Sequence, residues 1–149
     1  MRPIYRVLAL LIALGVVVQA MSVALGWFMV LKDVDDGAVF DKNTDFNFGQ
    51  VTHGMVGMMV IPLLAILLLI VSFFARIAGG VKWAAIVFGL VVLQIALAFG
   101  GFGVPAIGAL HGLNALALLA VAGIAGRRAA DAQPPVVTDT EAVAQPPAV

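Results

Sequence analysis

Two side chains in this 149-residue sequence are suited to bind a metal within an apolar environment, and both are histidines. His53 and His111 are the only histidines of the chain, and each is followed directly by glycine within a long uncharged stretch. If those stretches are helices, the histidines lie about five or six residues inside them, roughly 7–9 Å from the same end of each helix. Two imidazoles at equal depth on two helices can supply both axial ligands of a b-type haem, with apolar side chains holding the porphyrin.

Small residues near the histidines fit the same hypothesis. Gly54 and Gly112 follow them, and Gly57 and Gly108 lie about one helical turn away, which leaves room for the edge of a flat macrocycle. Close helix packing is the alternative, since Gly108 and Gly112 also form a small-xxx-small motif. The predicted cofactor-binding set is therefore His53, His111, Gly54, Gly57, Gly108, Gly112, Gln94 and Asn114.

Polar residues inside the apolar stretches have simpler interpretations beside the haem hypothesis. Gln94 and Gln19 are expected to form hydrogen bonds between helices. Asn114 is expected either to do the same or to orient an axial imidazole from one turn away. Without a metal, His111 would bond to Gln94 or Asn114, and His53 would be an interfacial residue at the end of a span. Met58 or Met59 is an alternative iron ligand.

Composition defines the class of protein that must position these residues. Hydrophobic residues make up 63% of the chain and charged residues 11%, whereas a soluble domain has about 25% charged residues. This excludes an ordinary soluble enzyme and predicts an integral membrane protein. A net charge of zero argues against nucleic acid as a partner. The absence of cysteine from the sequence excludes disulfides, iron–sulfur clusters and covalently attached haem.

Uncharged runs predict where the chain crosses the membrane. They cover residues 7–31, 46–75 and 83–126, and the last is long enough for two spans because glycines and Pro105 interrupt it. Four spans result, at about 7–31, 51–74, 83–101 and 105–126, within a domain of residues 1–128. The expected fold is an all-α, integral membrane four-helix bundle. The N-terminal segment has the alternative of a signal peptide, but its apolar run continues past Ala20, which favours an uncleaved span.

The distribution of cations predicts the orientation of these spans. Arg2, Arg6, Arg76, Lys82, Arg127 and Arg128 fall on one side, and Lys32 and Lys42 fall on the other. By the positive-inside rule, both termini are cytoplasmic and the acidic loop 32–50 lies outside. That loop begins like a calcium-binding loop, but Gly37 stands at the third ligand position, so we interpret it as a solvated turn. Residues 129–149, rich in Ala, Pro and Val, are expected to form a disordered cytoplasmic tail.

A weak internal repeat relates the two halves of the chain. The first predicted span contains VVVQAMSVALG around Gln19, and the third contains VVLQIALAFGG around Gln94. The second and fourth spans carry His53-Gly54 and His111-Gly112. The repeat predicts two helical hairpins, each contributing one glutamine and one histidine to the bundle.

The stretches LVVLQIALAFGGFGVPAIGALHGLNALALL and QVTHGMVGMMVIPLLAILLLIVSF resemble spans of the heme A synthase family. That family consists of two four-helix halves in tandem, each with a haem between two histidines, and this chain resembles one half over about residues 48–126. The resemblance implies that His53 and His111 are an axial pair. The family has a glutamate where this chain has Gln50, and many members have a cysteine pair that is absent here, so the resemblance implies haem binding without implying oxidation of the haem. The chain also resembles small four-span bacterial membrane proteins.

Together these patterns predict a multi-pass protein of the bacterial cytoplasmic membrane that binds one haem b for electron transfer or haem handling. No catalytic residue is assigned. The expected partners are the lipid bilayer and a respiratory or haem-biosynthesis membrane complex, with a homodimer as an open alternative. A non-catalytic accessory or assembly subunit without cofactor is the alternative function. A transporter is disfavoured, because no predicted span contains Asp or Glu.

Overall fold

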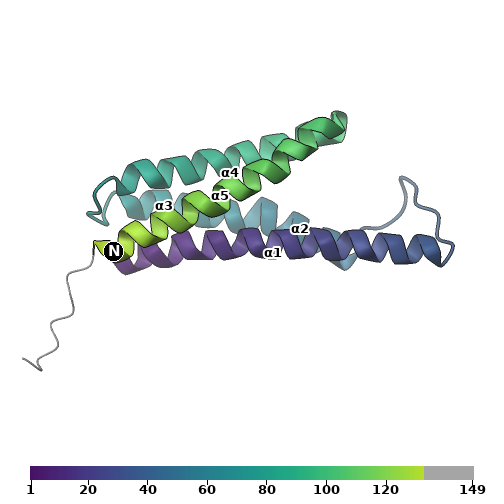
Figure 1. Ribbon diagram of the computed structural model, residues 1–149, viewed down its shortest axis with the longest axis horizontal. Coiled ribbons are helices and arrows are strands. Elements are labelled where there is room, and N and C mark those ends of the chain that lie inside the picture. The colour runs from purple at the N-terminus through teal and green to yellow at the C-terminus, as the bar shows by residue number, and fades with distance from the viewer. Residues whose placement is uncertain (133–149) are drawn as a thin grey trace, which may run out of the picture.

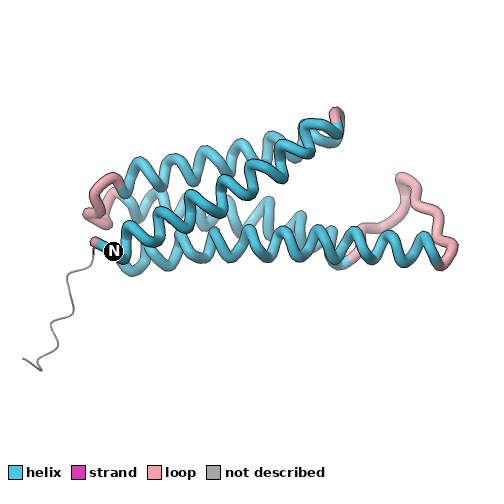
Figure 2. The backbone as a smooth tube through the Cα atoms, in the orientation of Figure 1, coloured by secondary structure: helices cyan, strands magenta, loops and turns pink. Residues whose placement is uncertain are grey.

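Long apolar segments with few helix-breaking residues fold into four membrane-length helical segments in the computed structural model, which describes residues 1–132. Within that part of the chain there are helices and loops but no strand (Figures 1 and 2). The elements are α1 (Arg2–Asp35), α2 (Phe48–Met55), the π-helix η1 (Val56–Val60), α3 (Ile61–Ser72), α4 (Gly80–Gly103) and α5 (Pro105–Asp131). The elements α2, η1 and α3 form one continuous span, Phe48–Ser72. The predicted all-α four-helix bundle is confirmed.

The helices extend beyond the predicted spans because backbone hydrogen bonding continues where the apolar composition ends. The first helix runs on to Asp35, and α5 runs to Asp131 with Ala129 fully buried. The prediction that the disordered tail starts at residue 129 is therefore wrong for residues 129–131, which are helical. Of the remainder of that predicted tail, Ala132 lies in a turn, and residues 133–149 lie outside the described residues.

The second span contains a π-helical turn that the sequence analysis did not predict. Pro62, in the first turn of α3, has no backbone N–H and cannot donate to the carbonyl of Met58. The five residues before α3 adopt π geometry, a local widening that accommodates such a lost bond. The π turn lies immediately C-terminal to α2, the segment that carries His53.

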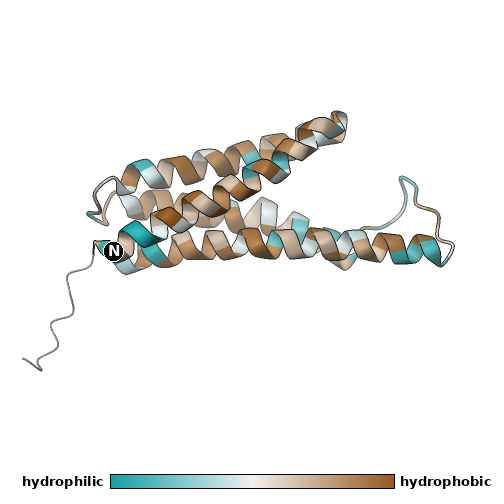
Figure 3. Cartoon of the chain, viewed as in Figure 1, coloured by the Kyte–Doolittle hydropathy of each residue, from teal (hydrophilic) through white to brown (hydrophobic). Residues whose placement is uncertain are grey.

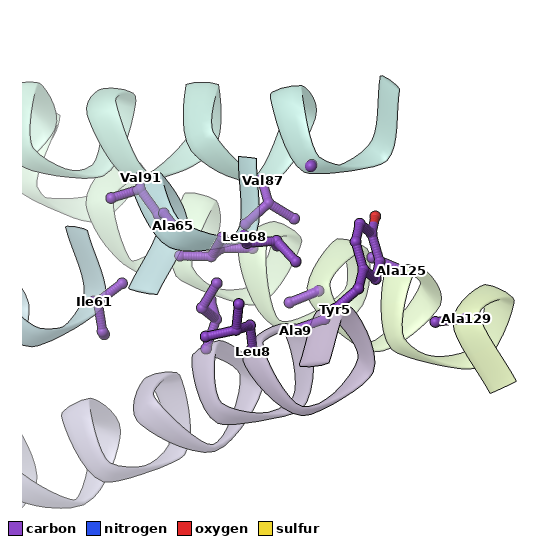
Figure 4. Packing of buried hydrophobic residues seen from close by; sticks show 14 of the residues in the cluster. Tyr5, Leu8, Ala9, Ile61, Ala65, Leu68, Val87, Val91, Ala125 and Ala129 are labelled. Atoms are coloured by element: carbon purple, nitrogen blue, oxygen red, sulfur yellow. The ribbon is translucent and has the colours of Figure 1, made fainter. Parts of the chain in front are cut away.

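The hydrophobic core lies in the half of the bundle that contains both the N-terminus and the end of α5 (Figure 1). Tyr5 is 1% exposed, and its hydroxyl donates to the carbonyl oxygen of Gly80 at 2.9 Å, joining α1 to α4. Small side chains let the helices approach closely, as Figure 4 shows around Leu68. The fully buried alanines are Ala9, Ala65, Ala84, Ala122, Ala125 and Ala129.

At the opposite end of the bundle, the α4–α5 hairpin leans away from α1 and α2 (Figure 1). Hydrophobic residues cover the helices along their length (Figure 3), and large ones such as Met21, Phe28 and Phe99 remain more than 60% exposed. An exterior of this kind suits lipid rather than water. The predicted break between the third and fourth spans is a single non-helical residue, Val104, followed by Pro105 in the first turn of α5.

Candidate functional site

The structure brings His53 and His111 together from different hairpins. His53 lies on α2 and His111 on α5, and their ring centroids are 6.2 Å apart with an angle of 60° between the ring planes. Both side chains are half-buried. The equal depth expected from the sequence therefore corresponds to a real proximity of the two imidazoles.

Each imidazole is held by a backbone carbonyl of the neighbouring helix in its own hairpin. Nδ1 of His53 lies 3.2 Å from the carbonyl oxygen of Gln19, and Nδ1 of His111 lies 3.0 Å from that of Gln94. A carbonyl oxygen only accepts hydrogen bonds, so Nδ1 must carry the proton in each ring. In the neutral imidazole, Nε2 then has a free lone pair, which is the tautomer that metal-binding histidines commonly adopt.

The two hairpins thus repeat one local arrangement. In α1 and α2 the pair is Gln19 with His53, and in α4 and α5 it is Gln94 with His111. The weak internal repeat of the sequence predicted one glutamine and one histidine per hairpin, and in each hairpin the histidine bonds to the backbone carbonyl of that glutamine. The predicted interhelical bond of the Gln19 side chain is wrong, because its buried Nε2 has no partner among the described residues, whereas the Gln94 side chain forms such a bond.

Hydrogen bonds around Gln94 strengthen the second pair. Its Nε2 donates to the carbonyl oxygen of His111 at 3.0 Å, so Gln94 and His111 are joined by two reciprocal bonds. The buried Asn114 donates through Nδ2 to Gln94 Oε1 at 2.6 Å and to the Leu90 carbonyl oxygen at 2.9 Å. The predicted interhelical bonds of Gln94 and Asn114 are confirmed, but Asn114 fixes Gln94 rather than bonding to the imidazole.

The first hairpin lacks this support. The residue three positions after His53 is Val56, where the second hairpin has Asn114 three positions after His111. Among the described residues, Nε2 of Gln19 is buried and has no hydrogen-bond partner. It is the one buried side-chain nitrogen or oxygen without a partner in the part of the chain described, and a buried donor of this kind costs about 1–3 kcal/mol.

The four glycines predicted to belong to the site have different surroundings. A Cβ added at Gly54 or at Gly112 would meet no atom within 4 Å, and both glycines are exposed, so the open space next to them lies on the outer surface of the bundle. A Cβ at Gly57 would lie 3.3 Å from Gln19 Oε1, and one at Gly108 would lie 3.8 Å from the Cα of Gly101. Gly57 therefore accommodates the Gln19 side chain, whereas the contact at Gly108 is an ordinary one; the close approach of α4 to α5 depends on Gly101, whose added Cβ would lie 3.0 Å from the Cα of Gly108.

Sequence reasoning missed the residues that join α2 to α1. Asn47 caps α2: its Oδ1 accepts from the Gln50 backbone N–H at 3.1 Å, and its own N–H donates to Gln50 Oε1 at 3.0 Å. Asn47 Nδ2 also donates to the Gly26 carbonyl oxygen at 2.9 Å. The Asn-x-x-Gln spacing before an apolar run is a capping-box signal that could have been recognised in the sequence. The contact with Gly26 had no such signal.

These features define the class of protein. Four helices of 24 to 34 residues are long and apolar enough to cross a bilayer, so the chain is a multi-pass α-helical membrane protein. A family of unknown function (DUF6220) matches residues 38–101, from the loop after α1 to near the end of α4. The match includes His53 and Gln94 and stops before His111 and Asn114. No curated protein and no solved structure matches the chain.

Proposed function

We propose that this protein binds one b-type haem between His53 and His111 in the bacterial cytoplasmic membrane, with both termini cytoplasmic. Electron transfer or haem handling is the corresponding function. The observation that carries the proposal is the pair of Nδ1 hydrogen bonds to Gln19 and Gln94, which leaves Nε2 of both imidazoles available for iron.

The separation of the rings supports this assignment. Two imidazoles that held one metal ion between them through bonds of about 2 Å would need ring centres only several ångströms apart. The observed centroid distance is 6.2 Å. In the described residues, no group of three or more His, Cys, Asp or Glu side chains could hold a metal ion. A site with two protein ligands suits haem, because the porphyrin supplies the four equatorial nitrogens itself.

The surrounding residues would orient the ligands and exclude water. The backbone carbonyls of Gln19 and Gln94 accept hydrogen bonds from the Nδ1–H groups, which fixes each ring and raises the basicity of its Nε2. Asn114 holds Gln94 in place. A haem with both axial positions filled supplies one-electron chemistry and has no free position for oxygen.

The half-length resemblance to heme A synthase agrees with a haem-binding role but supplies no catalytic residue. At the position of the family's glutamate, Gln50 caps α2 through its side-chain oxygen. This oxygen bonds to the Asn47 backbone and has a structural task at the helix start. We therefore assign the chain no oxidation reaction on haem.

Visible spectroscopy of the purified full chain tests the proposal. After expression with ample haem, the reduced-minus-oxidised spectrum is expected to show a Soret band and an α band. H53A and H111A should each abolish the bis-histidine signal, and added imidazole should restore part of it in H111A. The control variants M58L and M59L should leave the spectrum unchanged, since both methionines are exposed and neither is needed as a ligand. A colourless wild-type protein would refute haem binding.

An accessory or assembly subunit without cofactor is the second candidate. It is favoured by the fact that both Nδ1 atoms already have partners within the bundle, so the histidines have a structural role even without metal. This alternative predicts a colourless protein that copurifies with a larger membrane complex. It also predicts that either histidine variant lowers stability without any spectral change.

A further inference from the structure

Cationic side chains gather at the end of the bundle that contains the N-terminus, the α3–α4 loop and the end of α5. They are Arg2, Arg6, Arg76, Lys82, Arg127 and Arg128. Within residues 1–132 the one salt bridge joins Lys32 to Asp36, at the other end of the molecule. None of the six cations forms a salt bridge within residues 1–132, and Asp131 is the one acidic residue described at this end, so the end carries a net positive charge.

Two of these arginines are joined at a shallow recess. Arg2 donates from Nη1 to the Ala132 carbonyl oxygen at 2.7 Å and from Nη2 to the Arg76 carbonyl oxygen at 3.3 Å. Both acceptors are uncharged, so they hold the Arg2 guanidinium in place while leaving its charge uncompensated. The recess beside it is lined by Met1, Arg2, Pro3, Phe74, Ala75 and Arg76.

Arg76 has a backbone conformation that is unfavourable for its residue type. Its φ is +52°, and it is the only non-glycine residue with positive φ among those described. Glycine adopts this conformation at little cost, as Gly79 does at φ +69° in the same loop, whereas a side chain adds about 1 kcal/mol. Since glycine would shape the loop at lower cost, the arginine at this position calls for a task of its side chain.

The recess also has an apolar side that matches the edge of a membrane. Phe73 is 64% exposed and Phe74 63% exposed, next to Arg76 at the end of a membrane-length span. We propose that this recess binds the headgroup of an anionic phospholipid. The phosphate would lie between the Arg2 and Arg76 guanidiniums, and an acyl chain would lie against Phe74. The proposal is independent of haem binding.

Thermal unfolding of the full chain in mild detergent tests the proposal, with phosphatidylglycerol, phosphatidylcholine or inorganic phosphate added. Phosphatidylglycerol is expected to raise the Tm most, phosphatidylcholine less because its choline offsets the phosphate charge, and inorganic phosphate hardly at all. R76G should weaken the apparent affinity for phosphatidylglycerol about fivefold, the effect of losing one cation near an anionic lipid. Without lipid, R76G should leave the Tm unchanged or raise it, because glycine relieves the positive φ.

K82Q is the matched control, since it removes one charge at the same end but Lys82 does not line the recess. It should weaken the lipid effect less than R76G does. If R76G and K82Q weaken the apparent affinity for phosphatidylglycerol equally, the lipid responds only to the general positive potential of this end, and the proposed binding site is overturned. An equal response to inorganic phosphate would overturn the lipid assignment. A fall in the lipid-free Tm of R76G would show that Arg76 is structural and would also overturn it.

Discussion

The backbones of α1 and α2 lie so close together at Gly49 that one added methyl group is predicted to lower the stability of the protein strongly. A Cβ added at Gly49 would lie 2.3 Å from the backbone nitrogen of Gly26 and 2.6 Å from both the Gly26 Cα and the Ser22 carbonyl oxygen. Ordinary contacts begin at 3.4 Å, so G49A must move the two backbones apart by about 1 Å. No flexible side chain is available to absorb the displacement.

The contacts at Gly49 give the size of the expected loss in the free energy of unfolding. Overpacking of this kind costs about 1–3 kcal/mol, and a 1 Å separation also breaks the 2.9 Å bond from Asn47 Nδ2 to Gly26, worth about 1 kcal/mol. The control is G54A in the same helix, where a Cβ meets nothing within 4 Å. Gly54 lies inside the span, where alanine gains about 1 kcal/mol of helix propensity over glycine, and Gly49 in the first turn of α2 gains no more than that, so this term does not reduce the difference. We expect G49A to be less stable than G54A by about 2–4 kcal/mol.

Titration of both variants with sodium dodecyl sulfate in mixed micelles, followed by circular dichroism, measures this difference in the free energy of unfolding. If G49A and G54A unfold within about 0.5 kcal/mol of each other, the close α1–α2 crossing is wrong. The position of His53 is then also in doubt, because α2 carries it towards Gln19.

Two further predictions concern buried hydrogen bonds. Q94M should lower the free energy of unfolding by about 2–3 kcal/mol, because Gln94 bonds to both His111 and Asn114. Q19M should leave the free energy of unfolding unchanged or raise it, because it removes a buried donor without a partner among the described residues. The same unfolding titration measures both, and equal losses would contradict the asymmetry of the hairpins. Y5F should cost about 1–2 kcal/mol through loss of the 2.9 Å bond to Gly80, and an unchanged midpoint would argue against that contact.

Much of the fold could be predicted from the sequence because lipid imposes simple constraints. A span needs about 20 uncharged residues with every backbone group bonded internally, so the uncharged runs located all four helical segments. Their ends could not be predicted as well, because a helix continues through charged residues such as Asp35 and Asp131 once it leaves the apolar region. The π turn was not predicted either, because a proline in the first turn of a helix is compatible with regular α-helical geometry as well.

The sequence by itself determined which residues were available for chemistry. With two histidines, no cysteine and apolar surroundings, the candidate site had to include His53 and His111. The repeat around Gln19 and Gln94 indicated which helices would be partners. These conclusions depend on residue type and spacing, which are local properties of the chain.

Only the tertiary structure decided what those residues contact. The 6.2 Å ring separation depends on how two hairpins pack, and the bonded nitrogen of each imidazole depends on a carbonyl from another helix. The surroundings of the glycines were also decided by the tertiary structure. Gly54 and Gly112 face open space, whereas Gly49, which no sequence motif had indicated, lies against the backbone of α1. Spacing along one helix fixes a residue's depth and face, but the atom opposite it belongs to a distant segment and is set only when the helices pack.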